Sequence, residues 1–259
     1  MSHKLCLLLA LAMLLLCGCT AVPHQPRETM PPPESTVPTT LPTTLPTTEP
    51  KEVHTPLYIP GFSTEDVILY FREVCLDAEI INSGNPEVLQ KWDEPILYCI
   101  CGSPTQEDTD TVEGFVQWLN TLEGFPGMKE THQETDANYR IHFCSHEEMI
   151  QLMGSAFVDT DGAVTFRYLD DRIYDAIVCI RTDLNQYLRN SVILEEIYNS
   201  LGPIQDTLLR SDSIIYADYS EPQQLTAMDE LILKLLYHPD MKCGLTPSRC
   251  DRLIHRLYY

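Results

Sequence analysis

Oxygen-bearing side chains gather in one short stretch of the chain, EEIYNSLGPIQD, residues 195–206. Glu195 and Glu196 are adjacent, so on a helix their carboxylates point about 100° apart and have different surroundings. A carboxylate of this kind that faces a cleft can act in proton transfer. The oxygens of Asn199, Gln205 and Asp206 follow, and a ligand set made of oxygen alone favours hard cations over zinc. The stretch therefore predicts acid–base chemistry at a carboxylate, with zinc poorly held.

The spacing of these residues resembles the active-site half of the metzincin branch of zinc peptidases. The metzincin signature places H-E-x-x-H-x-x-G-x-x-H on a helix, followed by a Ser-Ile-Met-like turn beneath the metal. The resemblance implies that Glu196 is the general base and that Gly202 is the bend. It also implies that Ser213 and Ile215 form the turn and that residues 225–237 form a closing helix.

All three metal positions of that signature carry other residues in this chain. Glu195, Asn199 and Gln205 stand where the family has histidines, and Asp206 adjoins the third position. Catalytic zinc needs three protein ligands, mostly imidazole nitrogen, and an open position for water. Because neutral amides are weak donors, we expect no metal and no cofactor, with zinc as the alternative if distant histidines converge on the helix. The histidines of the domain are His132, His142, His146, His238 and His255.

Other residues near the signature have two interpretations each. Tyr216 and Tyr198 could donate hydrogen bonds to a substrate carbonyl, or they could be core aromatics. Arg210 could pair with Glu195 or Glu196 and so replace the positive charge of the metal. The two glutamates could equally be an ordinary acidic pair on a helix. The catalytic interpretation assigns Glu196 and Tyr216 to the site.

Hydrophobic periodicity predicts the elements that must position this stretch. Helices are expected over residues 63–80, 109–122, 145–153, 188–202 and 228–239, strands over 96–101 and 138–144, and a hairpin over 162–180. Capping spacing occurs at Ser63 with Asp66, at Ser145 with Glu148 and at Thr226 with Asp229. The strand over 96–101 is apolar on both sides, which is typical of a strand buried between two layers. The order predicts an α+β fold with a mixed sheet and a central helix.

A second resemblance extends over residues 58–245, to a family of bacterial lipoproteins known as domain-of-unknown-function family 2927. It rests on the pieces YFREVCLDAEI, KWDEPI, ILEEIYNSLG, DSIIY and LTAMDELILKLLYHPDMKCGL, which occur in the family's order. That family brings no established activity. Together the two resemblances imply a single zincin-like domain over residues 58–259.

The N-terminal residues predict a bacterial lipoprotein signal. Residues 1–18 contain a basic start and an apolar run, and the sequence Leu16-Cys17-Gly18-Cys19 that follows the run resembles the lipobox, in which Cys19 would be lipidated. An ordinary secreted protein cut elsewhere is the alternative. Residues 19–57 are rich in Pro and Thr and cannot bury a core, so we expect a disordered stalk. The protein should then be extracytoplasmic and lipid-anchored to the bacterial cell membrane.

Charge excludes one class of partner. The chain has 17 Lys plus Arg against 38 Asp plus Glu, a formal net charge of −21. Because no basic patch could follow a phosphate backbone, nucleic acid is not expected as a partner.

Most of the cysteines in the domain are expected to be buried free thiols that pack as small apolar residues. Cys243 and Cys250 are the pair that a disulfide would join. Cys99 and Cys101 are separated by one residue, so on a strand they share a face, which is poor geometry for a bridge.

These features predict a lipid-anchored protein whose pseudo-metallopeptidase domain is a binding or scaffold module, with a cell-envelope protein or polysaccharide as partner. The alternative is an active hydrolase of peptide or cell-wall substrates that uses Glu196 as general base with atypical metal ligands. A third possibility is a wall-binding domain whose site lies elsewhere, because fold does not fix function.

Overall fold

The computed structural model describes residues 57–76, 88–218 and 221–259. The predicted signal peptide, Cys19 and the predicted linker up to residue 56 lie outside these ranges. All described residues belong to one compact unit of the chain. Within that described part, no helix has both the length and the apolar character needed to cross a bilayer.

A six-stranded sheet forms the centre of this unit, and every strand runs parallel to its neighbour except β5. The strands are β1 (Lys91–Trp92), β2 (Ile96–Gly102), β3 (Met128–Glu130), β4 (Tyr139–Cys144), β5 (Gly162–Leu169) and β6 (Arg172–Arg181). Because β5 pairs with β6 along nearly its whole length, β1 and β4 share the other edge of β6. β2 then joins β4, and β3 pairs with β2. The predicted mixed sheet is confirmed, although helices alternate with strands instead of being segregated from them as in an α+β fold.

Helix boundaries follow local capping chemistry. The helices are α1 (Thr64–Cys75), α2 (Gln106–Leu119), α3 (His146–Met153), α4 (Gln186–Asn199), α5 (Ala227–Leu236) and α6 (Pro247–Leu257), with short 3-10 turns η1 (Glu134–Asp136) and η2 (Ser155–Phe157). The three predicted capping boxes are present at the starts of α1, α3 and α5. A fourth, formed by Thr105 and Asp108, begins α2 earlier than the apolar pattern indicated.

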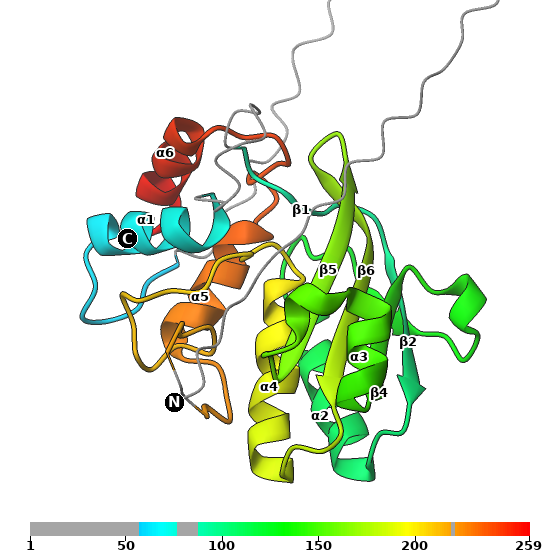
Figure 1. The fold of residues 1–259 in the computed structure, drawn as a ribbon. Helices are drawn as coiled ribbons and strands as arrows, with labels where there is room; N and C mark the ends of the chain where they lie inside the picture. Colours follow the sequence, from blue (N-terminus) through cyan, green and yellow to red (C-terminus); the bar gives the residue numbers. More distant parts are fainter. Residues whose placement is uncertain (1–56, 77–87, 219–220) are drawn as a thin grey trace, which may run out of the picture. The chain divides into compact units, whose positions relative to one another are not determined.

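Different helices cover the two faces of the sheet. On one face, Ile141 of β4 and Val178 of β6 belong to the main core together with side chains of α2 and α4. On the other face, Cys179 of β6 packs with Met149 of α3 in a second, smaller cluster. Figure 1 shows α1, α5 and α6 gathered on one side of α4 and the sheet on the other. α4 therefore lies centrally, as expected for the helix that carries the signature.

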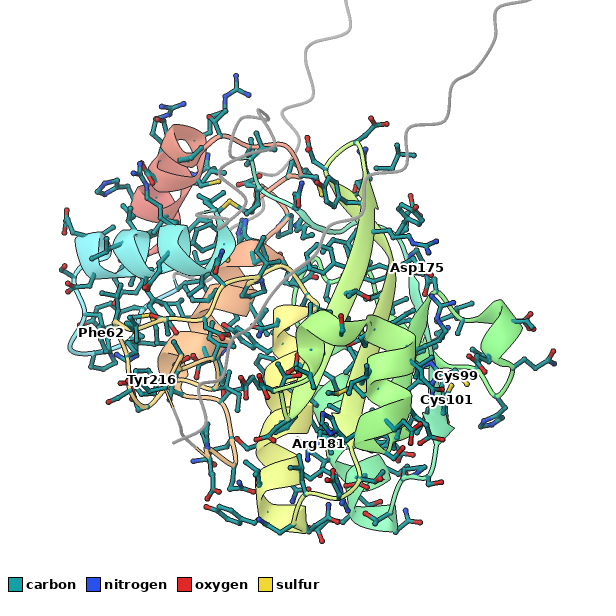
Figure 2. All side chains as sticks on the ribbon, viewed as in Figure 1. Phe62, Cys99, Cys101, Asp175, Arg181 and Tyr216 are labelled. Carbon is teal, nitrogen blue, oxygen red and sulfur yellow. The ribbon has the colours of Figure 1, made fainter. Side chains whose placement is uncertain are left out.

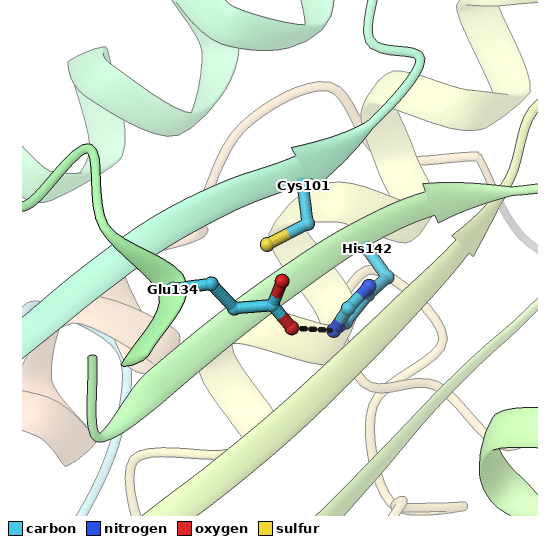
Figure 3. A group of neighbouring side chains, drawn as sticks. All are labelled: Cys101, Glu134 and His142. Atoms are coloured by element: carbon cyan, nitrogen blue, oxygen red, sulfur yellow. Dashed lines mark ion pairs between the residues drawn. The ribbon is translucent and has the colours of Figure 1, made fainter. Parts of the chain in front are cut away.

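The prediction that β2 is buried between two layers is wrong for its outward face. Leu97 is 39% exposed and Cys101 is partly exposed, because α3 packs on β4 and β6 and only η1 lies beside β2. Figure 3 shows the result, with Cys101 of β2 beside His142 of β4 and Glu134 of η1. The apolar residue types alone did not reveal which face lacked a covering helix.

Two further expectations are corrected at the C-terminal end. The final helix is α6, whose stripe of apolar residues is narrow because Arg and His occupy most of its other positions. Cys243 and Cys250 are both free thiols, so the expected pair is not bridged. The remaining described cysteines are also free, and most are buried, as predicted.

Candidate functional site

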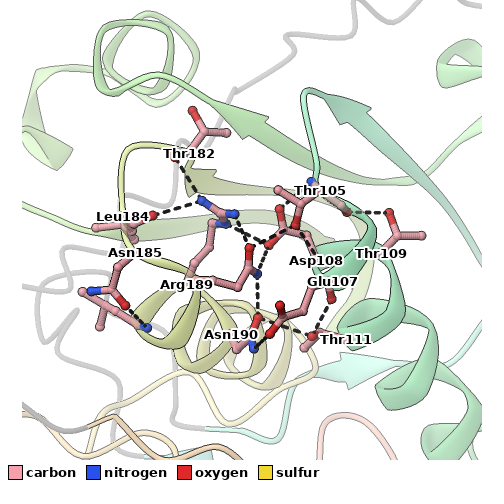
Figure 4. A network of polar contacts seen from close by, with 12 residues as sticks. Thr105, Glu107, Asp108, Thr109, Thr111, Thr182, Leu184, Asn185, Arg189 and Asn190 are labelled. Carbon is pink, nitrogen blue, oxygen red and sulfur yellow. Dashed lines mark hydrogen bonds and ion pairs between the residues drawn. The ribbon is translucent and has the colours of Figure 1, made fainter.

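An ion pair to α2 fixes the start of α4, the helix that carries the signature. Arg189 Nε donates to Asp108 Oδ1 at 2.8 Å, and Arg189 Nη1 donates to the carbonyl oxygens of Thr182 and Leu184 at 3.0 Å. Gln186 Nε2 adds a bond of 2.6 Å to the same Asp108 oxygen (Figure 4). Because the Arg189 guanidinium is buried and saturated with partners, it sets the position of the helix and is not available to a ligand.

Glu195 and Glu196 are both buried on the next turns of α4, at 8% and 4% exposure. Glu196 lies directly against the start of β5. A Cβ on Gly162 would lie 2.8 Å from Glu196 Oε1 and from its Cγ, so only glycine leaves room for this side chain. The adjacent pair is therefore not the solvated acidic surface that an ordinary helix would present.

The charge of Glu196 also acts on Tyr139 of β4. Burial raises the pKa of Tyr139, a hydrogen bond with Ser200 opposes this, and the negative charge of Glu196 raises it further. The Tyr139 hydroxyl lies 2.6 Å from Ser200 Oγ. Glu196 thus lies in electrostatic contact with the interior between α4, β4 and β5.

The side chain of Asn199 meets the loop that follows α4. Asn199 is 1% exposed. Its Nδ2 donates to Asp206 Oδ1 at 3.3 Å, while its Oδ1 is buried and accepts no hydrogen bond from the described residues. Gln205 is partly exposed and its backbone N–H donates to Val74 of α1. The structure therefore brings Asn199 and Asp206 together and directs the backbone of Gln205 toward α1.

Gly202 is a bend, as the resemblance implied. Its φ is +128°, and a Cβ there would lie 2.9 Å from the carbonyl oxygen of Gln90. Both the left-handed backbone and the close approach of the chain before β1 require glycine.

The turn that contains Ser213 and Ile215 is buried and held by α5. Asp229, the capping residue of α5, accepts hydrogen bonds from Ser213 Oγ at 2.7 Å and from the N–H of Ile214 at 3.2 Å. Tyr70 of α1 donates to Ser213 Oγ at 2.8 Å. Helices α1 and α5 therefore both hold this turn, α5 through the buried carboxylate of Asp229 and α1 through the hydroxyl of Tyr70.

The tyrosines and Arg210 have structural partners. Tyr198 is fully buried and donates to the carbonyl oxygen of Asp229 at 3.0 Å, so it is a core aromatic. Tyr216 is partly exposed, and its hydroxyl donates to Asp218 at 3.2 Å within the same segment. Arg210 pairs with Asp212 at 2.6 Å and lies over the ring of Phe62.

No group of three His, Cys, Asp or Glu ligand atoms surrounds α4 in the described ranges. The group found is Cys101, Glu134 and His142, whose ligand atoms lie within 4.8 Å of one another. His146 Nε2 lies 2.6 Å from the carbonyl oxygen of Val158, and His238 Nδ1 accepts from the N–H of Asp240. The alternative, in which distant histidines converge on the helix, is not seen among these contacts of the described residues.

Two features of the structure were not predicted from the sequence. Gly162 is one of 11 glycines in the sequence, and its significance is seen only in its contact with Glu196. Cys101 and His142 lie on different strands, and their proximity depends on the register that pairs them across β2 and β4. A spacing rule within one segment cannot detect either.

The α4 region can hold a buried carboxylate against a strand edge, and its oxygens and amides form a weak set for zinc. No curated protein matches this chain. One family profile matches residues 64–256, which is most of the chain. This protein belongs to the family described as protein of unknown function (DUF2927).

Proposed function

We propose that this protein is a lipid-anchored, extracytoplasmic binding module built on a zincin-like domain that has no zinc at α4. The carrying observation is that Asn199, at a position where zinc peptidases have histidine, is buried and hydrogen-bonded to Asp206. The described part also contains no cluster of nitrogen or sulfur ligands around this helix. A neutral amide that already bonds a carboxylate is a poor ligand for a metal that activates water.

The contacts that hold the bend and the turn support this proposal. The bend at Gly202 and the turn at Ser213 are held by packing and by the buried Asp229. In a metallopeptidase the corresponding parts surround the ion, whereas these contacts are made among protein groups. On this proposal the domain keeps the shape of the site and lacks the catalytic ion.

The open edge of β5 indicates how such a module could bind. Among the described strands β5 pairs only with β6. Residues 162–164 are buried, so its other edge offers unpaired backbone N–H and C=O groups over residues 165–169. At the end of the hairpin, Tyr168, Leu169 and Tyr174 are 36%, 68% and 48% exposed. Exposed strand edges bind extended peptides through main-chain hydrogen bonds, with adjacent side chains adding specificity. We assign the role of partner to an extended segment of a cell-envelope protein.

Metal content and peptide cleavage test the absence of catalysis. The full chain carrying Cys101→Ser, which removes the other metal candidate, should contain no stoichiometric zinc after purification without chelator. It should also cleave none of a mixed-sequence peptide library. One zinc per chain that disappears in Asn199→Ala, together with peptide cleavage, would overturn the proposal.

Hydrogen exchange tests the binding mode. Peptides selected from the same library on the full chain should slow exchange at alternate amides of residues 165–169, because only alternate residues of a strand bond to one neighbour. Protection elsewhere, or sedimentation with insoluble peptidoglycan without any peptide binding, would contradict the assignment to β5.

A hydrolase is the second candidate, favoured by the burial of Glu196 beside the start of β5. In that case Glu196→Gln should abolish cleavage of peptide or peptidoglycan, while Glu195→Gln on the same helix should retain it. Equal activity in the wild type and Glu196→Gln would eliminate this candidate.

A further inference from the structure

A second cluster of chemically capable side chains lies on the outward face of the sheet, away from the main core. Cys99 and Cys101 project from β2, and His142 of β4 is paired in register with Cys101. Glu134 reaches over the same face from η1, with its Oε1 3.8 Å from His142 Nε2 (Figure 3). Two adjacent parallel strands and one turn therefore bring two thiols, an imidazole and a carboxylate together.

We propose that Cys101, His142 and Glu134 form a zinc site, with Cys99 as the fourth ligand. The three ligand atoms of Cys101, His142 and Glu134 lie within 4.8 Å of one another. Sulfur, imidazole nitrogen and one carboxylate are the donors that zinc takes in proteins, four at a time and tetrahedrally. The same soft donors disfavour magnesium and calcium.

The separation of the two sulfurs fits this metal. Cys101 Sγ lies 3.8 Å from Cys99 Sγ. With Zn–S bonds of about 2.3 Å, two thiolates on a tetrahedral zinc are about 3.8 Å apart. The strand thus holds the two sulfurs at the required spacing. Cys99 Sγ does not lie within 4.8 Å of all three other ligand atoms, so four-fold coordination requires side-chain rotations that bring it to the shared metal.

Electrostatics and accessibility suit a site that takes a cation from solvent. Among the described residues that act on the cluster, Arg140 is the one cation on this face. Its charge is neutralised by an ion pair with Asp175. The Glu134 side chain is 58% exposed, which leaves an entry path.

This site differs from the α4 region in position and in chemistry. Figure 2 places Cys99 and Cys101 on the β2 side of the molecule and Tyr216 on the side of α1 and α5. A zinc here would be held by four protein ligands with none left for water. Such closed sites stabilise structure, so this zinc would tie η1 to the exposed face of β2.

Cobalt substitution provides the direct test on the full chain, reduced and freed of metal. One equivalent of Co²⁺ should bind and give a thiolate-to-cobalt absorption band in the near ultraviolet. The band should be lost in Cys101→Ser and roughly halved in Cys99→Ser. Cys243→Ser, which alters another partly exposed thiol, is the matched control and should leave the band unchanged.

Zinc affinity and thermal stability complete the test. Zn²⁺ should bind at least 100-fold more weakly to His142→Ala and about ten-fold more weakly to Glu134→Gln. Added Zn²⁺ should raise the Tm of the wild type and not that of Cys101→Ser, although both fold without metal. Zinc retained in Glu196→Gln and Asn199→Ala would separate this site from α4.

Three results would overturn the proposal. The first is binding of Co²⁺ without a thiolate band, and the second is a band that persists in Cys101→Ser. The third is a disulfide between Cys99 and Cys101 in the isolated protein, with no uptake of Zn²⁺ after its reduction.

Discussion

Gly162 lies against the side chain of Glu196, which occupies the space that a Cβ at residue 162 would need. The position of a Gly162 Cβ lies 2.8 Å from Glu196 Oε1 and Cγ and 2.5 Å from Val192 Cγ1. The glycine therefore lets the start of β5 pack directly on the face of α4 that carries the acidic pair. This contact joins the central helix to the buried start of β5, the strand whose exposed end we assign to partner binding.

Gly162→Ala should destabilise the fold by about 1–3 kcal/mol, because Val192 and Glu196 must move to make room. Gly114→Ala is the matched control, since a Cβ there has nothing within 4 Å and Gly114 lies inside α2. That change should be neutral or stabilising by about 0.5–1 kcal/mol. Urea unfolding measures the free energy of unfolding of both variants. Equal changes in that free energy for Gly162→Ala and Gly114→Ala would disprove the contact.

Asp229→Ala should cost on the order of 3 kcal/mol. Its carboxylate accepts from Ser213, Ile214 and Thr226, so its removal leaves buried donors without partners. Asp66→Ala removes the equivalent capping residue of α1, where the bonds are exposed, and should give a smaller loss. Thermal unfolding of the two variants compares them, and similar Tm values would argue against a locking role for Asp229.

The Asp108–Arg189 pair should make stability sensitive to acid. Burial raises the pKa of Asp108, but hydrogen bonds from Arg189, Thr105 and Gln186 outweigh it and hold that pKa below its usual value. The unfolded chain therefore binds more protons below about pH 4, and stability falls as the pH falls through this range.

Arg189→Met leaves this carboxylate buried without its cation and should cost about 3–5 kcal/mol at pH 7. Its stability should also vary less between pH 2 and pH 5 than that of the wild type. Lys234→Met, which breaks an ion pair exposed on α5, should change stability by less than about 0.5 kcal/mol. Equal effects of the two substitutions would contradict the assigned role.

Lys91 should produce the opposite pH dependence. Burial lowers the pKa of Lys91 to about 8, while its Nζ donates to the carbonyl oxygen of Leu236 at 2.8 Å. Between about pH 8 and pH 10 the unfolded chain binds more protons at this residue, so stability rises with pH by about 2 kcal/mol.

Lys91→Met should lack that rise. Both proteins are best compared in the Cys243→Ser background, because the negative charge of the Cys243 thiolate raises the pKa of Lys91. Chemical unfolding at pH 8, 9 and 10 gives the difference. A parallel pH dependence in the two proteins would show that Lys91 keeps an ordinary pKa.

The sequence by itself determined the local features of this protein. Capping spacing located the starts of α1, α3 and α5, and apolar periodicity located β4 and the β5–β6 hairpin, because these signals act over a few residues. The sequence also shows Asn199 and Gln205 where the metzincin signature has histidines, since this comparison needs only the residue types.

Only the tertiary structure decided which distant groups meet. The contact of Glu196 with Gly162, the hold of Asp229 on the Ser213 turn and the proximity of Cys101 to His142 each depend on pairing between separate elements. The open outward face of β2 depended on where α3 packs. Such contacts are set by strand register and layer packing, which are long-range and leave no spacing pattern within a single segment.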